Sequence, residues 1–255
     1  MFIDLNSDLG ESFGNYKIGN DSEVMKYITS ANIACGFHAG DPLVIEKTIK
    51  LAMENKVAPG AHPGYPDLVG FGRRSLNLSD EELSSMIKYQ VGAVKAITES
   101  LGIRLQHVKL HGAMYNDMAF NYNKAKVAAE AIIRIDPDLI FVGLAGSEMI
   151  KAAEDIGLKT ANEFFADRAY NDDGTLVSRS IEGSVIHNTE VCLNRIEKLI
   201  KSNSVLSINN KEIKIIADTI CVHGDNENAV DFVKNLNGFL NEKGIKLRNL
   251  KDQNL

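Results

Sequence analysis

Residues 139–164 read LIFVGLAGSEMIKAAEDIGLKTANEF and contain one complete structural unit. The apolar run at its start predicts a strand over 139–144 that is covered on both faces. The segment 147–156 predicts a helix, and Gly157 follows it at the position where a left-handed residue commonly ends a helix. A second strand is predicted over 159–164. A strand, a helix and a strand joined by short connections predict parallel strands in one sheet.

The same alternation continues through the whole chain of 255 residues. Strands are predicted over 1–7, 30–35, 57–61, 106–110, 139–144, 159–164 and 215–222. Helices are predicted over 21–28, 42–55, 80–101, 121–135, 147–156, 189–202 and 227–243. About seven strand–helix units favour a single-domain parallel α/β barrel over residues 1–255, although periodicity alone also permits an open doubly wound sheet.

Two segments interrupt this alternation. Residues 62–78, HPGYPDLVGFGRRSLNL, predict a long loop rich in glycine and proline. Residues 204–216 predict a hairpin that turns at Asn209 and Asn210 and is inserted before the last strand.

Capping residues mark the start of two predicted helices. Asp41 supplies an N-cap ahead of Pro42, whose missing N–H costs nothing at the first helical position. Ser79 and Glu82 have the spacing of a capping box. We therefore expect helices to begin directly after Asp41 and Ser79.

Composition limits the classes of protein to which the chain can belong. A net charge of −6 argues against a nucleic-acid partner, because an acidic surface repels a phosphate backbone. The opening residues MFIDLNSDLGES lack the basic segment of a signal peptide, and no apolar run approaches the roughly 20 residues of a membrane span. The scattered Cys35, Cys192 and Cys221 form no metal-site or disulfide pattern. These features predict a cytoplasmic protein that does not bind membranes.

Histidines gather at one end of the predicted strands. His107 lies at the start of its strand, whereas four others follow strand ends: His38, His62, His111 and His223. Asp8 and Glu11 follow the first strand, and Asp167 and Arg168 follow the sixth. The C-terminal ends of parallel strands share one face of a barrel, so residues far apart in sequence are expected to converge there. We expect polar residues from at least five units to line one pocket.

Seven segments, spread in order along the chain, carry a specific resemblance: DLNSDLGESFG, SANIACGFHAGDP, GAHPGYPDLVGFGRR, VKLHGAMYN, EFFADRAY, SRSIEGSVI and ICVHGDN. Together they resemble the signature blocks of the 5-oxoprolinase A-subunit family, also called LamB/YcsF. Leu110 departs from the family pattern, which usually has proline there, but Lys109 and His111 are in place. The resemblance implies a seven-stranded barrel related to carbohydrate deacetylases. It also implies an assembly with subunits B and C that opens 5-oxoproline (pyroglutamate) to glutamate, coupled to ATP hydrolysis.

Lactam hydrolysis gives these residues candidate roles. It needs a base to activate water and an acid to protonate the departing nitrogen, which Asp8, His38, His62 and His111 can supply. The substrate carboxylate, or a phosphate, needs cations or backbone N–H groups, for which the candidates are Lys109, Arg168 and Arg179; His223 and Asp225 are further candidates for substrate binding. Asp225 fits the N-cap of the last helix equally well, and Cys35 fits a small buried hydrophobe better than a nucleophile. No GxxxxGK[ST] motif is present, so we expect a partner subunit to handle ATP.

Lys109 is the most informative of these candidates. It alternates with Val108 and Leu110, so its side chain is expected to point into the barrel, where Asp8 or Glu163 offsets its charge. We expect Lys109→Met to fold, with unchanged or higher stability, because a buried charge is expensive. We also expect this variant to lose activity in the full assembly.

Two other functions fit the same residues. Asp8, His38 and His62 could hold a divalent metal ion with open positions, as in a metal-dependent deacetylase. Polar residues clustered at strand ends also suit a subunit that binds a small molecule without catalysis. Metal analysis and turnover with the partner subunits distinguish these hypotheses.

Overall fold

The computed structural model describes residues 1–222 and 229–253. The predictions for His223 and Asp225 therefore lie outside the described residues. Among the residues that are described, no helix is long and apolar enough to cross a membrane.

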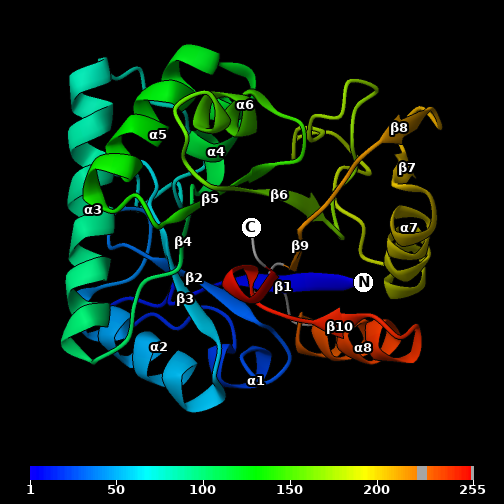
Figure 1. The fold of residues 1–255 in the computed structure, drawn as a ribbon, viewed down its shortest axis with the longest axis horizontal. Coiled ribbons are helices and arrows are strands. Elements are labelled where there is room, and N and C mark those ends of the chain that lie inside the picture. The colour runs from blue at the N-terminus through cyan, green and yellow to red at the C-terminus, as the bar shows by residue number, and fades with distance from the viewer. Residues whose placement is uncertain (223–228, 254–255) are drawn as a thin grey trace.

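Seven parallel strands form a closed barrel (Figure 1). Each strand pairs with the next, and the last pairs with β1, so the predicted barrel is confirmed and the open sheet is excluded. The barrel strands are β1 (Phe2–Leu9), β2 (Ser30–Ala34), β3 (Ala58–His62), β4 (His107–Lys109), β5 (Ile140–Leu144), β6 (Thr160–Phe165) and β9 (Thr219–Val222). A short β10 (Lys246–Leu247) pairs with the start of β1.

Helices surround the strands, as Figure 1 shows. They are α1 (Asp21–Val24), α2 (Pro42–Asn55), α3 (Asp80–Ser100), α4 (Gly112–Phe120), α5 (Tyr122–Ile135), α6 (Glu148–Glu154), α7 (Thr189–Ser202) and α8 (Ala229–Glu242), with a final 3-10 helix η1 (Leu250–Gln253). Both predicted caps are confirmed: the Asp41 side chain accepts from two backbone N–H groups of α2, and Ser79 and Glu82 form a capping box.

Helix α4 was not predicted from the sequence. Its buried residues are Ala113, Met114, Tyr115, Met118 and Ala119. They include three in succession, so the helix has no single apolar stripe of helical spacing that would reveal it. The helix starts directly behind His111 and places Tyr115 against the barrel interior.

Several predicted boundaries also move. Strand β1 continues to Leu9, so Asp8 lies within the strand and not after it. The predicted helix over 21–28 shrinks to α1. The predicted hairpin is confirmed as β7 (Ser204–Leu206) paired antiparallel with β8 (Glu212–Lys214), and β9 begins only at Thr219.

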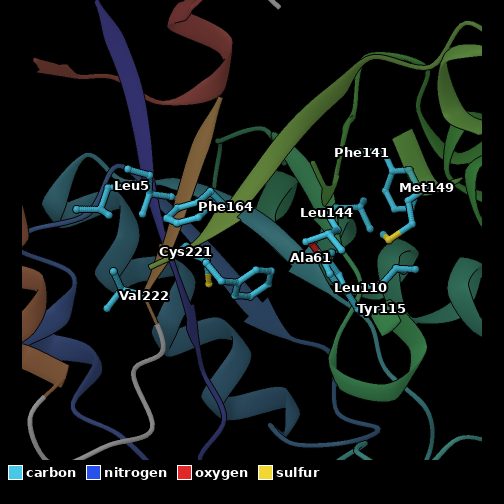
Figure 2. Packing of buried hydrophobic residues seen from close by; sticks show 14 of the residues in the cluster. Leu5, Ala61, Leu110, Tyr115, Phe141, Leu144, Met149, Phe164, Cys221 and Val222 are labelled. Carbon is cyan, nitrogen blue, oxygen red and sulfur yellow. The ribbon is translucent and has the colours of Figure 1, made fainter. Parts of the chain in front are cut away.

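The outward faces of the strands pack against the helices in one apolar core. Figure 2 shows Phe141 of β5 beside Met149 of α6. The inward faces are different, because they carry a buried polar layer that includes Asp4, Asn6 and Glu163. The barrel interior therefore contains a hydrogen-bonded polar group that leads towards the strand ends where the candidate site lies, beside a small apolar cluster that includes Ile140, Val142 and Leu250.

Candidate functional site

A cavity of about 630 Å³ opens at the C-terminal ends of the strands. Its walls come from four strand–helix units and from the loop after β6, and they include Asp8, Glu11, His62, Lys109, His111, Phe165 and Arg168. The predicted convergence at this face is confirmed. Five units were predicted to line it, and the described residues supply four; His38 lies behind the cavity wall.

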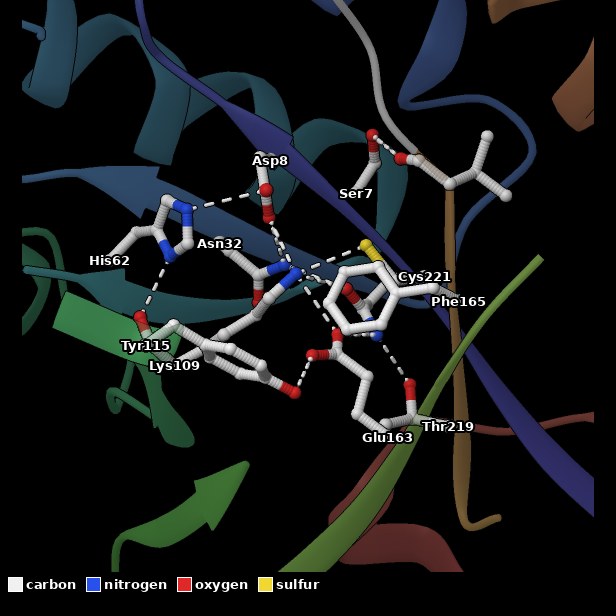
Figure 3. Close-up of polar contacts among 12 residues, drawn as sticks. Ser7, Asp8, Asn32, His62, Lys109, Tyr115, Glu163, Phe165, Thr219 and Cys221 are labelled. Carbon is white, nitrogen blue, oxygen red and sulfur yellow. Dashed lines mark hydrogen bonds and ion pairs between the residues drawn. The ribbon is translucent and has the colours of Figure 1, made fainter. Parts of the chain in front are cut away.

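Lys109 is fully buried at the centre of the polar layer (Figure 3). Its Nζ donates to Asp8 Oδ1 at 2.9 Å and lies 2.9 Å from Glu163 Oε1. It also lies 3.0 Å from Cys221 Sγ and over the Phe165 ring. The inward direction predicted for Lys109 is confirmed, and both carboxylates expected to offset its charge are present.

Burial alone would lower the pKa of Lys109, because it penalises the ammonium form. The carboxylates of Asp8 and Glu163, with the Cys221 sulfur, outweigh this effect and raise the pKa well above its ordinary value. Lys109 therefore stays cationic. Tyr115, on the unpredicted α4, donates its hydroxyl hydrogen to Glu163 Oε2 at 2.8 Å and completes this buried group.

His62 and His111 form a contact pair on the cavity wall. His62 Nε2 lies 3.0 Å from His111 Nδ1 and 3.3 Å from Asp8 Oδ2. The other ring nitrogen of each histidine contacts a backbone carbonyl oxygen. His62 Nδ1 lies 2.7 Å from the Lys109 oxygen, and His111 Nε2 lies 2.8 Å from the Phe71 oxygen. Burial, followed by the nearby His62, lowers the pKa of His111 well below its ordinary value.

His38 is buried beside this pair. Its ring stacks on that of His111, with centroids 3.7 Å apart and planes 3° apart. Neither of its ring nitrogens has a hydrogen-bond partner in the described structure. Burial, with the neighbouring His111 and His62, lowers the pKa of His38 well below its ordinary value.

The glycine-rich loop over 62–78 holds the histidines by close backbone approach. A Cβ added to Gly64 would lie 2.6 Å from His38 Nδ1, and one added to Gly72 would lie 2.7 Å from the Cβ of His38. Side chains at these two positions would therefore displace His38. The sequence indicated a glycine-rich loop, but it did not indicate that the carbonyl of Phe71 orients a histidine.

Arg168 and Arg179 both line the cavity. Arg168 is buried and donates from Nε to the Ser184 carbonyl and from a terminal nitrogen to the Val177 carbonyl. It thus ties down the loop after β6 while facing the cavity. Burial, and then the charge of Arg179, lowers the pKa of Arg168 to about 10. Arg73 is a third arginine on the wall, and no pattern in the sequence singled it out.

Two other predicted assignments can be compared with the structure. His107 lies in β4, away from the cavity, where its Nε2 contacts Asn32 Oδ1 and burial lowers its pKa to about 3. Cys35 is buried and forms no disulfide, and burial raises its pKa, which agrees with a core role. Cys192 and Cys221 are likewise free and buried.

Four buried side chains could hold a metal ion: Glu11, His38, His62 and His111 have donor atoms within 4.8 Å of one another. The set predicted from sequence was Asp8, His38 and His62. The geometry brings Glu11 and His111 into the group, whereas Asp8 Oδ1 accepts hydrogen bonds from Asn32 and Lys109.

The fold and the cavity together define a parallel α/β barrel in which carboxylate, imidazole and cationic side chains converge at the C-terminal ends of the strands. The sequence model of the LamB/YcsF family matches residues 3–255, and the chain belongs to this family. It is 54% identical over 245 residues to the A subunit of 5-oxoprolinase from Alkaliphilus metalliredigens, and the match covers 96% of each chain.

One solved structure agrees with this assignment. The lactam utilization protein from Thermus thermophilus superposes with a TM-score of 0.92 at 39% identity, over 97% of this chain and 99% of that one. The peptidoglycan deacetylase PdaC from Bacillus subtilis aligns with a TM-score of 0.48 at 13% identity, over 98% of this chain and 88% of that one. The second likeness is too weak to support a statement about activity.

Proposed function

We propose that this chain is the 5-oxoprolinase subunit that opens the lactam of 5-oxoproline to glutamate. The observation that carries the proposal is its match, over nearly the whole length of both chains, with relatives named as the A subunit of 5-oxoprolinase. The cavity supports it independently, because buried carboxylate, imidazole and cationic groups face one space of a size that suits a small molecule.

The reaction breaks the ring C–N bond, joins the oxygen of water to the carbonyl carbon and delivers a proton to the nitrogen. Asp8 and His62 lie side by side on the cavity wall and are our candidates for accepting the proton of water. Lys109 keeps Asp8 in place through its ion pair. Arg168 and Arg179 face the same cavity, where a guanidinium can pair with the substrate carboxylate.

An unstrained lactam resists water, and its opening is unfavourable without coupling. Transfer of a phosphoryl group from ATP to the lactam oxygen would activate the carbonyl and release phosphate when water attacks. The chain contains no GxxxxGK[ST] motif, so we assign ATP use to the partner subunits B and C. This chain then acts on the activated lactam.

Glutamate release from 5-oxoproline with ATP tests the proposal. The complete assembly should produce glutamate, and both the isolated chain and the assembly that lacks it should produce almost none. His62→Asn in the assembly should reduce turnover by about 10²–10⁴-fold at unchanged thermal stability. Full turnover without this chain would refute the proposal.

The same assay distinguishes a catalytic subunit from one that only binds 5-oxoproline. If His62→Asn still binds 5-oxoproline and the assembly retains full turnover, the cavity binds substrate without catalysing its hydrolysis. The deacetylase alternative is tested by supplying N-acetylated sugars to the isolated chain and measuring acetate. Acetate release that depends on His62, with no glutamate formed by the assembly, would replace the proposed function.

A further inference from the structure

The hydrogen bonds of His62 and His111 determine which of their ring nitrogens carry protons. A carbonyl oxygen only accepts hydrogen bonds, so His62 Nδ1, 2.7 Å from the Lys109 oxygen, carries its hydrogen. His111 Nε2, 2.8 Å from the Phe71 oxygen, does the same. A neutral imidazole has one N–H, so His62 Nε2 and His111 Nδ1 both present lone pairs.

These two lone pairs face each other at 3.0 Å. Negative groups stand close by, since Asp8 Oδ2 lies 3.3 Å from His62 Nε2 and Glu11 Oε1 lies 4.0 Å from His111 Nδ1. Two electron-pair donors at this distance repel each other unless a cation lies between them. That cation is either a shared proton or a metal ion.

We propose that His62 Nε2, His111 Nδ1 and the Glu11 carboxylate bind one divalent transition-metal ion, with His38 as a fourth ligand. Two nitrogens bound at about 2.1 Å to one metal ion lie about 3.0 Å apart at an angle of about 90° and about 3.4 Å apart at the tetrahedral angle. The observed separation of 3.0 Å lies at the short end of this range. Imidazole and carboxylate donors suit Zn²⁺ and Co²⁺ better than Mg²⁺ or Ca²⁺.

His38 provides the second observation that points to a ligand. It is completely buried, both of its ring nitrogens lack partners among the described residues, and one donor atom lies within 4.8 Å of those of Glu11, His62 and His111. In the present stack its ring plane runs parallel to that of His111, so a rotation of the ring brings one nitrogen towards the ion. Binding would give His38 the partner that the described structure lacks.

The carbonyls that fix the two tautomers are an outer shell of the proposed site, because they orient the rings with the free nitrogens towards the ion. His62, His111 and Glu11 line the cavity, so a bound ion would face the substrate space, where it would polarise a carbonyl or a water molecule. Because His62 Nε2 would then bind the ion, Asp8 alone would accept the proton of water. The inference deepens the proposed function but rests on binding geometry, so it can be measured without turnover.

Metal binding by the purified full-length chain tests the site. Elemental analysis reports any ion carried from expression, and chelated protein is then titrated with Co²⁺, followed by its visible absorption, and with Zn²⁺ in competition. We expect one ion per chain. His62→Asn and His111→Gln are the informative variants, since each amide keeps the N–H that serves the carbonyl and removes the nitrogen that faces the ion. Each should weaken Co²⁺ binding by at least about 100-fold.

Two histidine variants outside the site serve as controls. His187→Gln removes an exposed histidine, and His107→Gln removes a buried one that contacts Asn32. Both should bind Co²⁺ as the wild type does. Thermal unfolding followed by circular dichroism verifies that each variant is folded. If one of the two site variants fails to fold, Co²⁺ binding by the other still tests the metal site.

Three results would overturn the inference. The wild-type chain could fail to bind one equivalent of Co²⁺, or both site variants could bind Co²⁺ as tightly as the wild type. Weakened binding in His187→Gln would indicate an adventitious surface site. A shared proton would appear instead in nitrogen NMR of the ion-free chain, as a doubly protonated ring that excludes Co²⁺. If the assembly turns over fully with no metal bound, the proposed function stands and the metal site fails. If the chain binds one ion but the assembly forms no glutamate, the metal site stands and the proposed function fails.

Discussion

Removing the charge of Lys109 should strongly destabilise the fold. The Nζ atom lies between Asp8 Oδ1 and Glu163 Oε1, at 2.9 Å from each, and Glu163 is completely buried. Lys109→Met would leave two carboxylates without their shared cation. Loss of one partner from a buried ion pair typically costs about 3–5 kcal/mol of unfolding free energy, and we expect a cost in that range. The sequence alone led to the opposite expectation, because a buried charge is expensive; the two carboxylates on Lys109 change the expected sign.

A double variant isolates the cause of this cost. Glu163→Gln removes one of the two carboxylates and keeps one oxygen, which can accept from Asn6, while its NH2 group can donate to the Tyr115 hydroxyl. Added to Lys109→Met, it should restore about 2 kcal/mol, which makes the two substitutions non-additive.

Urea unfolding followed by circular dichroism measures these free energies, because the chain has no tryptophan to report by fluorescence. Wild type, both single variants and the double variant complete the cycle. The reasoning fails if Lys109→Met matches the wild type in stability, or if the two substitutions simply add. Turnover per folded molecule in the assembly then reports whether Lys109 also acts on the substrate.

Three further predictions follow from buried groups and backbone geometry. Burial raises the pKa of Asp4 to about 6, so wild type should lose roughly 3 kcal/mol of stability relative to Asp4→Asn as pH rises from about 4 to about 7; a constant difference would contradict this. Gly112 has a φ of +55°, and an added Cβ would lie 2.7 Å from a backbone oxygen, so Gly112→Ala should cost about 2 kcal/mol or more in urea unfolding. Gly92→Ala, in a helix with open space around it, should instead gain about 0.5–1 kcal/mol, and equal effects would refute the argument. Arg168→Lys cannot serve both backbone carbonyls, so amide hydrogen exchange should accelerate in residues 176–185, and unchanged exchange would show that Arg168 does not hold that loop.

The fold was largely predictable because its signals are local. A strand covered on both faces, such as Ile140–Leu144, reads as an apolar run, and helix starts such as Ser79 carry capping residues. Closure of the sheet depends on the pairing of β1 with β9. The paired residues are more than 200 positions apart in the sequence, so no local pattern predicts this contact. Helix α4 was missed because its buried residues, three of them in succession, cover too broad a face for a clear apolar periodicity.

The site was predictable in its residue types and in its place at the strand ends, but its protonation pattern was not. His62 and His111 were recognisable because they lie at the ends of strands β3 and β4. Their tautomers depend on the carbonyls of Lys109 and Phe71, and those positions exist only after the loop over 62–78 has folded back. A backbone carbonyl has no signature in the sequence, so the facing lone pairs could only emerge from coordinates.

The polar interior connects the stability of the barrel to the chemistry of its open end. From Asp4 a continuous series of polar contacts passes through Thr219 and Asn6 to Glu163, and then through Lys109 to Asp8 and the histidine pair. Each contact in the series is between 2.5 and 3.3 Å long. Each member is buried, so each requires its neighbour to satisfy a charge or a hydrogen bond. A barrel filled with aliphatic side chains would be simpler to stabilise, but it could not hold Asp8 and His62 in one orientation. The interior therefore serves as the rigid support on which the acid–base residues at the strand ends depend.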